Sequence, residues 1–297
     1  MSHATASPRD SFAQRLLIGS VRKSYDPVVD IDWAEPLDPA KLFLPPRVVS
    51  LYGTDLWDAM TPDQQRELSR QELANVLSVG IWFENLLNRL LLRELLRGDP
   101  TSATSHYTLT EMADECRHMM MFGKLIERVE ARPYWPRPAA RLAITALPAV
   151  LHGPMVWVAA LVGEEIFDAL QRRMLDDPQL QPIVARAMRV HVTEEARHIG
   201  FARDALARRV PTMSAGERAY IRLCVAVAGP LFVSLVTNRH LYIRAGLDGR
   251  QARRAALGNP RARESRAAGA AELVTFLGQH GLIGSVGRRR WRAVGLL

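Results

Sequence analysis

The chain has 297 residues, of which 48% are hydrophobic, so it can bury a sizeable core as one large domain or two small ones. The formal net charge is +8, but the sequence has no zinc finger, aromatic RNA-binding motif or Gly-rich phosphate loop, which argues against nucleic-acid binding. Two cysteines, Cys116 and Cys224, are too few for a disulfide framework and favour a reduced, cytoplasmic protein. The basic charge is compatible with an acidic carrier protein as a partner.

Residues 1–60 are predicted to form an N-terminal arm that packs on the rest of the protein, because five prolines between positions 27 and 46 interrupt any long element. The first ten residues are polar and lack the apolar core of a signal peptide. Two later stretches, 142–163 and 219–237, are strongly apolar, but each contains proline and either histidine or arginine. We therefore expect buried helices of a large bundle there, and no membrane span.

Residues 61–297 are predicted to form one all-α domain, since no convincing alternating strand pattern occurs in them. Thr61 and Gln64 form a capping box, with a proline at the first helical position between them. Thr108 and Glu111 are interpreted as the capping box of the next helix. The predicted helices span 61–97, 108–131, 139–175 with a break near 153–154, 178–209, 214–246, 249–258 and 263–280.

Charged residues recur in the middle of four of these apolar helices, as two Glu-x-x-His pairs and two single glutamates. Positions i and i+3 lie on one face of a helix, so both side chains of each pair can reach one ion. Two such pairs and two single glutamates are the ligand set of carboxylate-bridged di-iron bundles, and these donors suit iron or manganese. The predicted metal ligands of this set are Glu84, Glu115, His118, Glu164, Glu195 and His198.

Two further choices concern the third and fourth of these helices. His191 lies four residues before Glu195 and seven before His198, on the same helix face. A lone histidine at this position is either a hydrogen-bonded core residue or a seventh ligand. The helix face that it shares with Glu195 and His198 favours the ligand. Glu164 is preferred to Glu165 because its helical neighbours are the more apolar set.

The residue before the ligand glutamate of each Glu-x-x-His pair is also acidic. These residues, Asp114 and Glu194, are called the outer carboxylates here. Each is predicted to accept the free N–H of a metal-bound histidine on the opposite helix. Arg117 and Arg197 can balance the charge of the outer carboxylates, although a plain surface role fits these arginines equally well.

The ligand pattern resembles that of the di-iron arylamine N-oxygenases of the p-aminobenzoate N-oxygenase type. The resemblance covers about residues 50 to 240 and rests on Glu84 in Trp-Phe-Glu-Asn-Leu-Leu, on the Asp-Glu-x-x-His segment that ends at His118, and on the extra histidine seven residues before the last, here His191. It implies a ferritin-like four-helix di-iron bundle with additional helices. It also implies two iron ions cycling between Fe2+ and Fe3+, O2 as co-substrate, a reductase or ferredoxin-type electron donor, and a homodimer.

The resemblance further implies oxidation of an arylamine to a hydroxylamine, and then to nitroso or nitro products, through a peroxo-di-iron intermediate. It implies no catalytic residue beyond the metal site and no organic cofactor. Two alternatives remain: a di-iron hydroxylase or desaturase that acts on a carbon centre, possibly of a carrier-bound substrate, and an iron-handling ferroxidase. Side chains expected to line a substrate pocket are Asn88, Met119, Phe122, Trp157, Ala160, Phe167 and Phe201.

Overall fold

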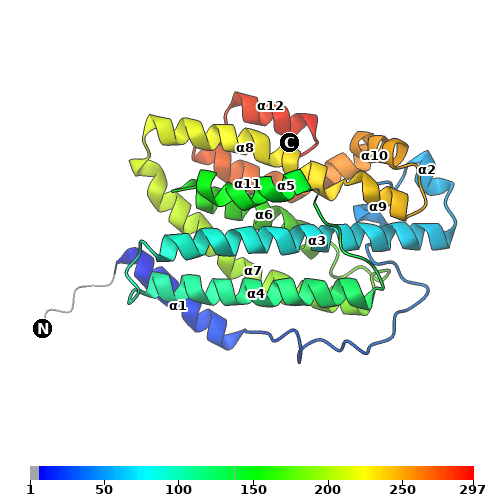
Figure 1. Ribbon diagram of the computed structural model, residues 1–297, viewed down its shortest axis with the longest axis horizontal. Coiled ribbons are helices and arrows are strands. Elements are labelled where there is room, and N and C mark those ends of the chain that lie inside the picture. The colour runs from blue at the N-terminus through cyan, green and yellow to red at the C-terminus, as the bar shows by residue number, and fades with distance from the viewer. Residues whose placement is uncertain (1–6, 137) are drawn as a thin grey trace, which may run out of the picture.

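The computed structural model describes residues 7–136 and 138–297, and Figure 1 shows them as a bundle of helices. Within these residues there is no strand, only an isolated β-bridge between Leu42 and Leu180. Four long helices form the centre of the bundle, where α3 packs on α4, α6 packs on α7, and both pairs contact each other. These helices are α3 (Pro62–Leu95), α4 (Ala103–Arg128), α6 (Met155–Arg172) and α7 (Pro182–Arg209). The predicted all-α four-helix bundle is confirmed.

Side-chain caps determine where α3 and α4 begin. The capping box predicted at the start of α3 is present, because the Thr61 hydroxyl accepts from the Gln64 amide and the Gln64 side chain accepts from the Thr61 amide. The capping box predicted for α4 was wrong. Ser102 caps this helix instead, so α4 begins at Ala103. Thr108 and Glu111 therefore lie inside α4, and both are buried.

Helices added around this centre complete the fold. The predicted break near 153–154 is confirmed, because it separates α5 from α6. The helix predicted over 214–246 ends ten residues early, since Asn238 caps a separate short helix. The last helix of the chain was not predicted. The outer helices are α5 (Pro138–Val150), α8 (Ala215–Val236), α9 (Arg239–Arg244), α10 (Gly249–Gly258), α11 (Pro260–Gln279) and α12 (Ser285–Ala293).

The N-terminal segment is more helical than the sequence analysis expected. It contains α1 (Pro8–Arg22), the one-turn helix η1 (Pro46–Val48) and the short α2 (Asp55–Asp58). The start of α1 has a sequence signal, because Ser7 caps the helix and a proline follows at its first position. Helix α1 lies across α4 and α7, so the N-terminal segment covers the two helices that carry the Glu-x-x-His pairs (Figure 1).

By length and composition, the stretch Ala215–Arg244 is apolar enough to cross a membrane, with a mean hydropathy of 1.9 and 33% of its most apolar window buried. This stretch comprises α8 and α9. Helix α8 packs on α12, where the Trp291 indole N–H donates to the carbonyl oxygen of Val225 at 2.7 Å. It is therefore an outer helix of the bundle that leaves an apolar side uncovered.

A buried carboxyl outside the predicted metal site makes folding stability depend on pH. Glu72 of α3 accepts hydrogen bonds from Ser50, yet burial raises its pKa to about 7. A carboxyl with a raised folded-state pKa stabilises the fold fully below its unfolded pKa, and this stabilisation is lost as the pH rises through 7. We expect the wild type to lose about 2–3 kcal/mol relative to Glu72→Gln between pH 5 and pH 8. Denaturant unfolding of both proteins at each pH measures this, and parallel pH profiles would contradict it.

Candidate metal centre

The side chains predicted as metal ligands converge inside the central four-helix bundle. Helix α3 supplies the first glutamate, α4 and α7 supply the Glu-x-x-His pairs, α6 supplies the third glutamate, and α7 adds the extra histidine. Their exposed fractions are only 0–4%. Burying this many carboxylates without cations would cost far more free energy than a domain can supply. The seven residues are Glu84, Glu115, His118, Glu164, His191, Glu195 and His198.

The donor atoms form two groups, each suited to one ion. In the first group the ligand atoms of Glu84, His118, His191 and Glu195 lie within 4.8 Å of one another. The second group is formed in the same way by Glu115, His198 and, again, Glu195. Because Glu195 belongs to both groups, the two ion positions are adjacent. The buried Glu/His cluster therefore fits a pair of metal ions.

Glu115 lies between the two Glu-x-x-His histidines. Its Oε1 is 2.8 Å from Nδ1 of His198, and its Oε2 is 2.8 Å from Nδ1 of His118. The first of these contacts lacks hydrogen-bond geometry, and neither of its atoms has another partner. A cation held by both atoms would stabilise this close contact in place of a hydrogen bond, so Glu115 and His198 would hold one ion together.

The far nitrogens of the same two histidines meet the outer carboxylates. The Nε2 atom of His118 lies 2.9 Å from Oε2 of Glu194, and Nε2 of His198 lies 3.2 Å from Oδ2 of Asp114. Each histidine thus reaches an outer carboxylate on the opposite helix. A carboxylate that accepts the Nε2 proton leaves the Nδ1 lone pair free, and Nδ1 is the nitrogen that faces the cluster.

Other groups hold the outer carboxylates in turn. Arg117 forms an ion pair with Asp114, and the Arg197 guanidinium lies 3.7 Å from Asp114 and 4.0 Å from Glu194. The backbone N–H of Tyr25, in the N-terminal segment, donates to Oε1 of Glu194 at 3.1 Å. Both arginines therefore lie where they balance the outer charge. The N-terminal segment also supports the site, which the sequence analysis did not predict.

The electrostatics show how the cluster is balanced when protons take the place of cations. Burial lowers the pKa of His118 and His198, but the carboxylates, Glu115 foremost, raise it further, so both pKa values lie well above the ordinary range. Burial and the Glu195 charge raise the pKa of Glu115, but the two histidines outweigh them and hold it at about 2. Metal ions that bind here must displace the histidine protons, so metal affinity falls as the pH falls.

His191 differs from the other two histidines. Burial lowers its pKa to about 4, so the ring is neutral at pH 7, and neither ring nitrogen has a hydrogen-bond partner. Its Nε2 lies 3.4 Å from Oε1 of Glu195 and 3.9 Å from Oε1 of Glu84. A core histidine normally satisfies at least one ring nitrogen. The open nitrogens and their position among the carboxylates fit a ligand better than a core residue.

The two consecutive glutamates of α6 have different surroundings. Glu165 forms an ion pair with Arg203, which turns its carboxylate away from the cluster. Both carboxylate oxygens of Glu164 are buried without a hydrogen-bond partner. Burial, followed by the charges of Glu195 and Glu115, raises the pKa of Glu164 well above the ordinary range. Glu164 therefore lies unpaired beside Glu84 and His191, as the prediction of a ligand from α6 requires, although it belongs to neither of the two donor groups.

Glu111 is a buried acid that the sequence analysis misread. It lies one helical turn before Glu115 on the same face of α4, is fully buried, and has no hydrogen-bond partner for either oxygen. Burial raises its pKa to about 8. Its spacing of four residues from Glu115 was the available signal, but the assumed cap at Thr108 placed Glu111 at a helix end.

The residues expected to line a substrate pocket do not share one environment, and Asn88 and Met119 are only half-buried. Phe122 and Phe167 border a small cavity of about 10 Å3, together with Glu84, Glu164 and His191. That cavity lies directly beside the predicted metal position. Others pack in the hydrophobic core, as do Trp157 and Phe201, whose ring centroids are 5.5 Å apart.

Replacing an outer carboxylate tests whether the histidine contacts support metal binding. We expect Glu194→Gln to weaken metal affinity by about 10–100-fold, because the amide is a weaker acceptor for the His118 N–H. Titration against a competing chelator measures this affinity. Glu165→Gln is the matched control, since Glu165 is also buried but pairs with Arg203 away from the cluster. Equal affinities for the two variants would contradict a supporting role for Glu194.

The chain is similar to known proteins and to one protein family. Uncharacterized proteins from Mycobacterium bovis and Mycobacterium tuberculosis are 34% identical to it over 217 residues, which covers 69% of this chain and 62% of theirs. The match therefore spans less than two thirds of the length of these curated relatives. The sequence profile of the P-aminobenzoate N-oxygenase AurF family matches residues 6–281. With the helical bundle and its buried Glu/His cluster, this match confirms the resemblance and the ferritin-like class: the chain belongs to the p-aminobenzoate N-oxygenase AurF family.

Proposed function

We propose that this protein is an O2-dependent di-iron oxygenase that oxidises the nitrogen of an arylamine. The observation that carries the proposal is the position of His191. It adds an uncharged nitrogen donor to a group that already contains Glu84, His118 and Glu195. The general ligand set of di-iron bundles has four glutamates and two histidines, and His191 adds a third histidine to it. The extra donor, together with family membership, favours nitrogen oxidation over the carbon-oxidising and iron-handling alternatives.

The seven converging residues would hold two iron ions, which when bound would supply reduction of O2 and transfer of oxygen, with electrons from an external donor. The protein's own contribution follows from its geometry. The outer carboxylates retain the Nε2 protons of His118 and His198, which fixes both rings. The buried surroundings exclude water from the reaction. A homodimer, a cytoplasmic location and a reductase or ferredoxin-type donor belong to the same proposal.

Metal analysis followed by a single turnover tests the proposal. Protein produced with iron should contain about two irons per chain. After chemical reduction and exposure to O2 with an aromatic amine, it should give a hydroxylamine, nitroso or nitro product, detected by mass spectrometry. Iron-loaded protein that consumes O2 without oxidising any amine would overturn the nitrogen assignment and favour a carbon-centre substrate. Protein that retains no iron would overturn the proposal as a whole.

A further inference from the structure

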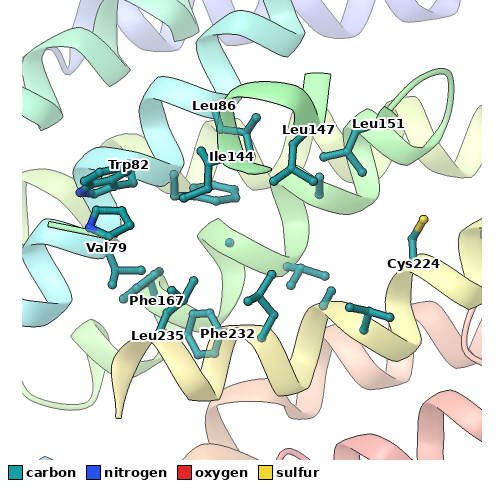
Figure 2. Close-up of a pocket in the computed structure, with 18 of the residues that line it drawn as sticks. Val79, Trp82, Leu86, Ile144, Leu147, Leu151, Phe167, Cys224, Phe232 and Leu235 are labelled. Atoms are coloured by element: carbon teal, nitrogen blue, oxygen red, sulfur yellow. The ribbon is translucent and has the colours of Figure 1, made fainter. Parts of the chain in front are cut away.

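A large cavity lies beside the predicted metal position, on the outer side of the bundle. It has a volume of about 400 Å3 and lies between α3, α5, α6 and α8 (Figure 2). This volume falls in the range of sites that bind a drug-sized molecule. Of the residues expected to line a substrate pocket, Phe167 lines this cavity, and two of its walls come from α5 and α8, which carry no predicted ligand.

The walls of this cavity are almost entirely hydrocarbon. The side chains drawn in Figure 2 present carbon, apart from ring nitrogen and the sulfur of Cys224, and none of the described residues that line the cavity is charged. The few polar groups already have protein partners. The Asn75 amide donates to the carbonyl oxygens of Leu235 and Val236, and the Tyr134 hydroxyl donates to Gln71. The described part of the lining therefore offers no cation for a carboxylate, and the indole N–H groups of Trp82 and Trp135 are donors that carry no charge.

The inner end of this cavity reaches the metal centre. Gly163 and Phe167 border both the large cavity and the small one that contains Glu84 and Glu164. The Phe83 ring lies directly over Gly163, where an added Cβ would overlap it. The Phe83 ring, carried by the residue next to Glu84 and packed on the residue next to Glu164, therefore lies with Phe167 at the boundary between the two cavities.

The outer end of this cavity opens on an apolar surface. Leu223, Val227 and Leu231 of α8 line the cavity and are 47–65% exposed. Val150 of α5 and Trp135 also line it and are 53% and 65% exposed. A molecule bound in the cavity would therefore have an apolar group at the end that faces this rim.

We propose that the substrate is an uncharged, lipophilic arylamine, with its apolar body in this cavity and its amino group directed past Phe83 to the metal centre. The proposal rests on the proposed function and specifies its substrate class. Aromatic amines are uncharged at neutral pH, so such a molecule brings no charge into the cavity. A carboxylate would lose its hydration in the cavity and find no cation, which costs several kcal/mol. 4-Aminobenzoate is therefore excluded by the same surface that accepts a 4-alkylaniline.

Direct binding measurements separate this proposal from the proposed function. Trp82 and Trp135 line the cavity and make an edge-to-face contact at 5.7 Å, so tryptophan fluorescence reports its occupancy. Iron-loaded protein, kept free of O2, is titrated with 4-hexylaniline and with 4-aminobenzoate. We expect at least a 100-fold tighter Kd for 4-hexylaniline. Equal or tighter binding of 4-aminobenzoate would overturn the substrate class, even if that amine were oxidised. Tight binding of 4-hexylaniline without oxidation would leave the binding site intact and refute nitrogen oxidation.

Two variants locate the binding site within the cavity. Ala159→Phe fills part of the cavity and should weaken 4-hexylaniline binding at least tenfold with the iron content unchanged. Ala268→Phe makes the same change on the exposed face of α11 and should bind normally. Leu231→Arg adds a cation at the rim and should strengthen 4-aminobenzoate binding at least tenfold, a gain that a misfolded protein cannot show. Unchanged binding of both amines in the two cavity variants would place the substrate elsewhere and overturn the proposal.

Discussion

Replacing Glu115 with alanine is expected to remove both metal ions and to abolish O2-dependent oxidation. One oxygen of Glu115 faces His198 and the other faces His118, and these two histidines belong to different donor groups, so this single side chain would serve both ion positions. Its loss would leave each position without one anionic donor. We expect the iron content to fall from about two per chain to background and activity to fall by about 1,000-fold or more.

Metal analysis and product quantification on the same preparations test this result. Glu165→Ala is the matched control, because it also removes a buried carboxylate. Glu165 follows Glu164 on α6, but its carboxylate pairs with Arg203. The control should retain its iron. Circular dichroism shows whether each variant keeps the helical fold. A folded Glu115→Ala protein that still holds two irons would disprove the role of Glu115 in holding the metal.

The overall fold could be predicted largely because helix signals are local. The Thr61 cap and the break near Gly153 lie within a few residues of the boundaries they set. The start of α4 was predicted wrongly because both Ser102 and Thr108 can act as a helix cap. Only the three-dimensional structure shows that Thr108 is buried within α4. The helix α1 was missed because the prolines after it suggested a loop for the whole segment.

The metal site was more predictable than the substrate site for a physical reason. Metal ligands must share a helix face, so the spacing of Glu115 and His118 carries the information. Hydrocarbon cavity walls have no such spacing requirement. Phe83 and Leu231 look in the sequence like any residues of a hydrophobic core, and only their three-dimensional arrangement distinguishes a cavity from a packed interior. The burial of Glu111 beside the metal site could also have been predicted, because its spacing of four residues from Glu115 can be read from the sequence.

His191→Leu is expected to keep both irons and to lose most nitrogen oxidation, by about 100-fold in rate. Leucine is close to histidine in volume, so the change removes the two ring nitrogens without opening a large cavity. The ion position beside His191 retains donors from Glu84, His118 and Glu195 after the change. The position held by Glu115 and His198 is untouched. Retained iron with lost activity would show that the seventh donor tunes the reaction and is not needed to hold the metal.

Phe122→Leu is the control for this experiment, because its ring packs on His191 with centroids 4.9 Å apart but supplies no donor atom. The control should lose some stability from the smaller side chain and keep its activity. If His191→Leu oxidises amines at the wild-type rate, His191 is a core residue and the nitrogen assignment loses its main support. If it loses iron as completely as Glu115→Ala, His191 holds the metal itself. Because its pKa of about 4 leaves His191 uncharged near pH 7, the change to leucine does not alter the charge of the cluster, and the comparison isolates the two ring nitrogens.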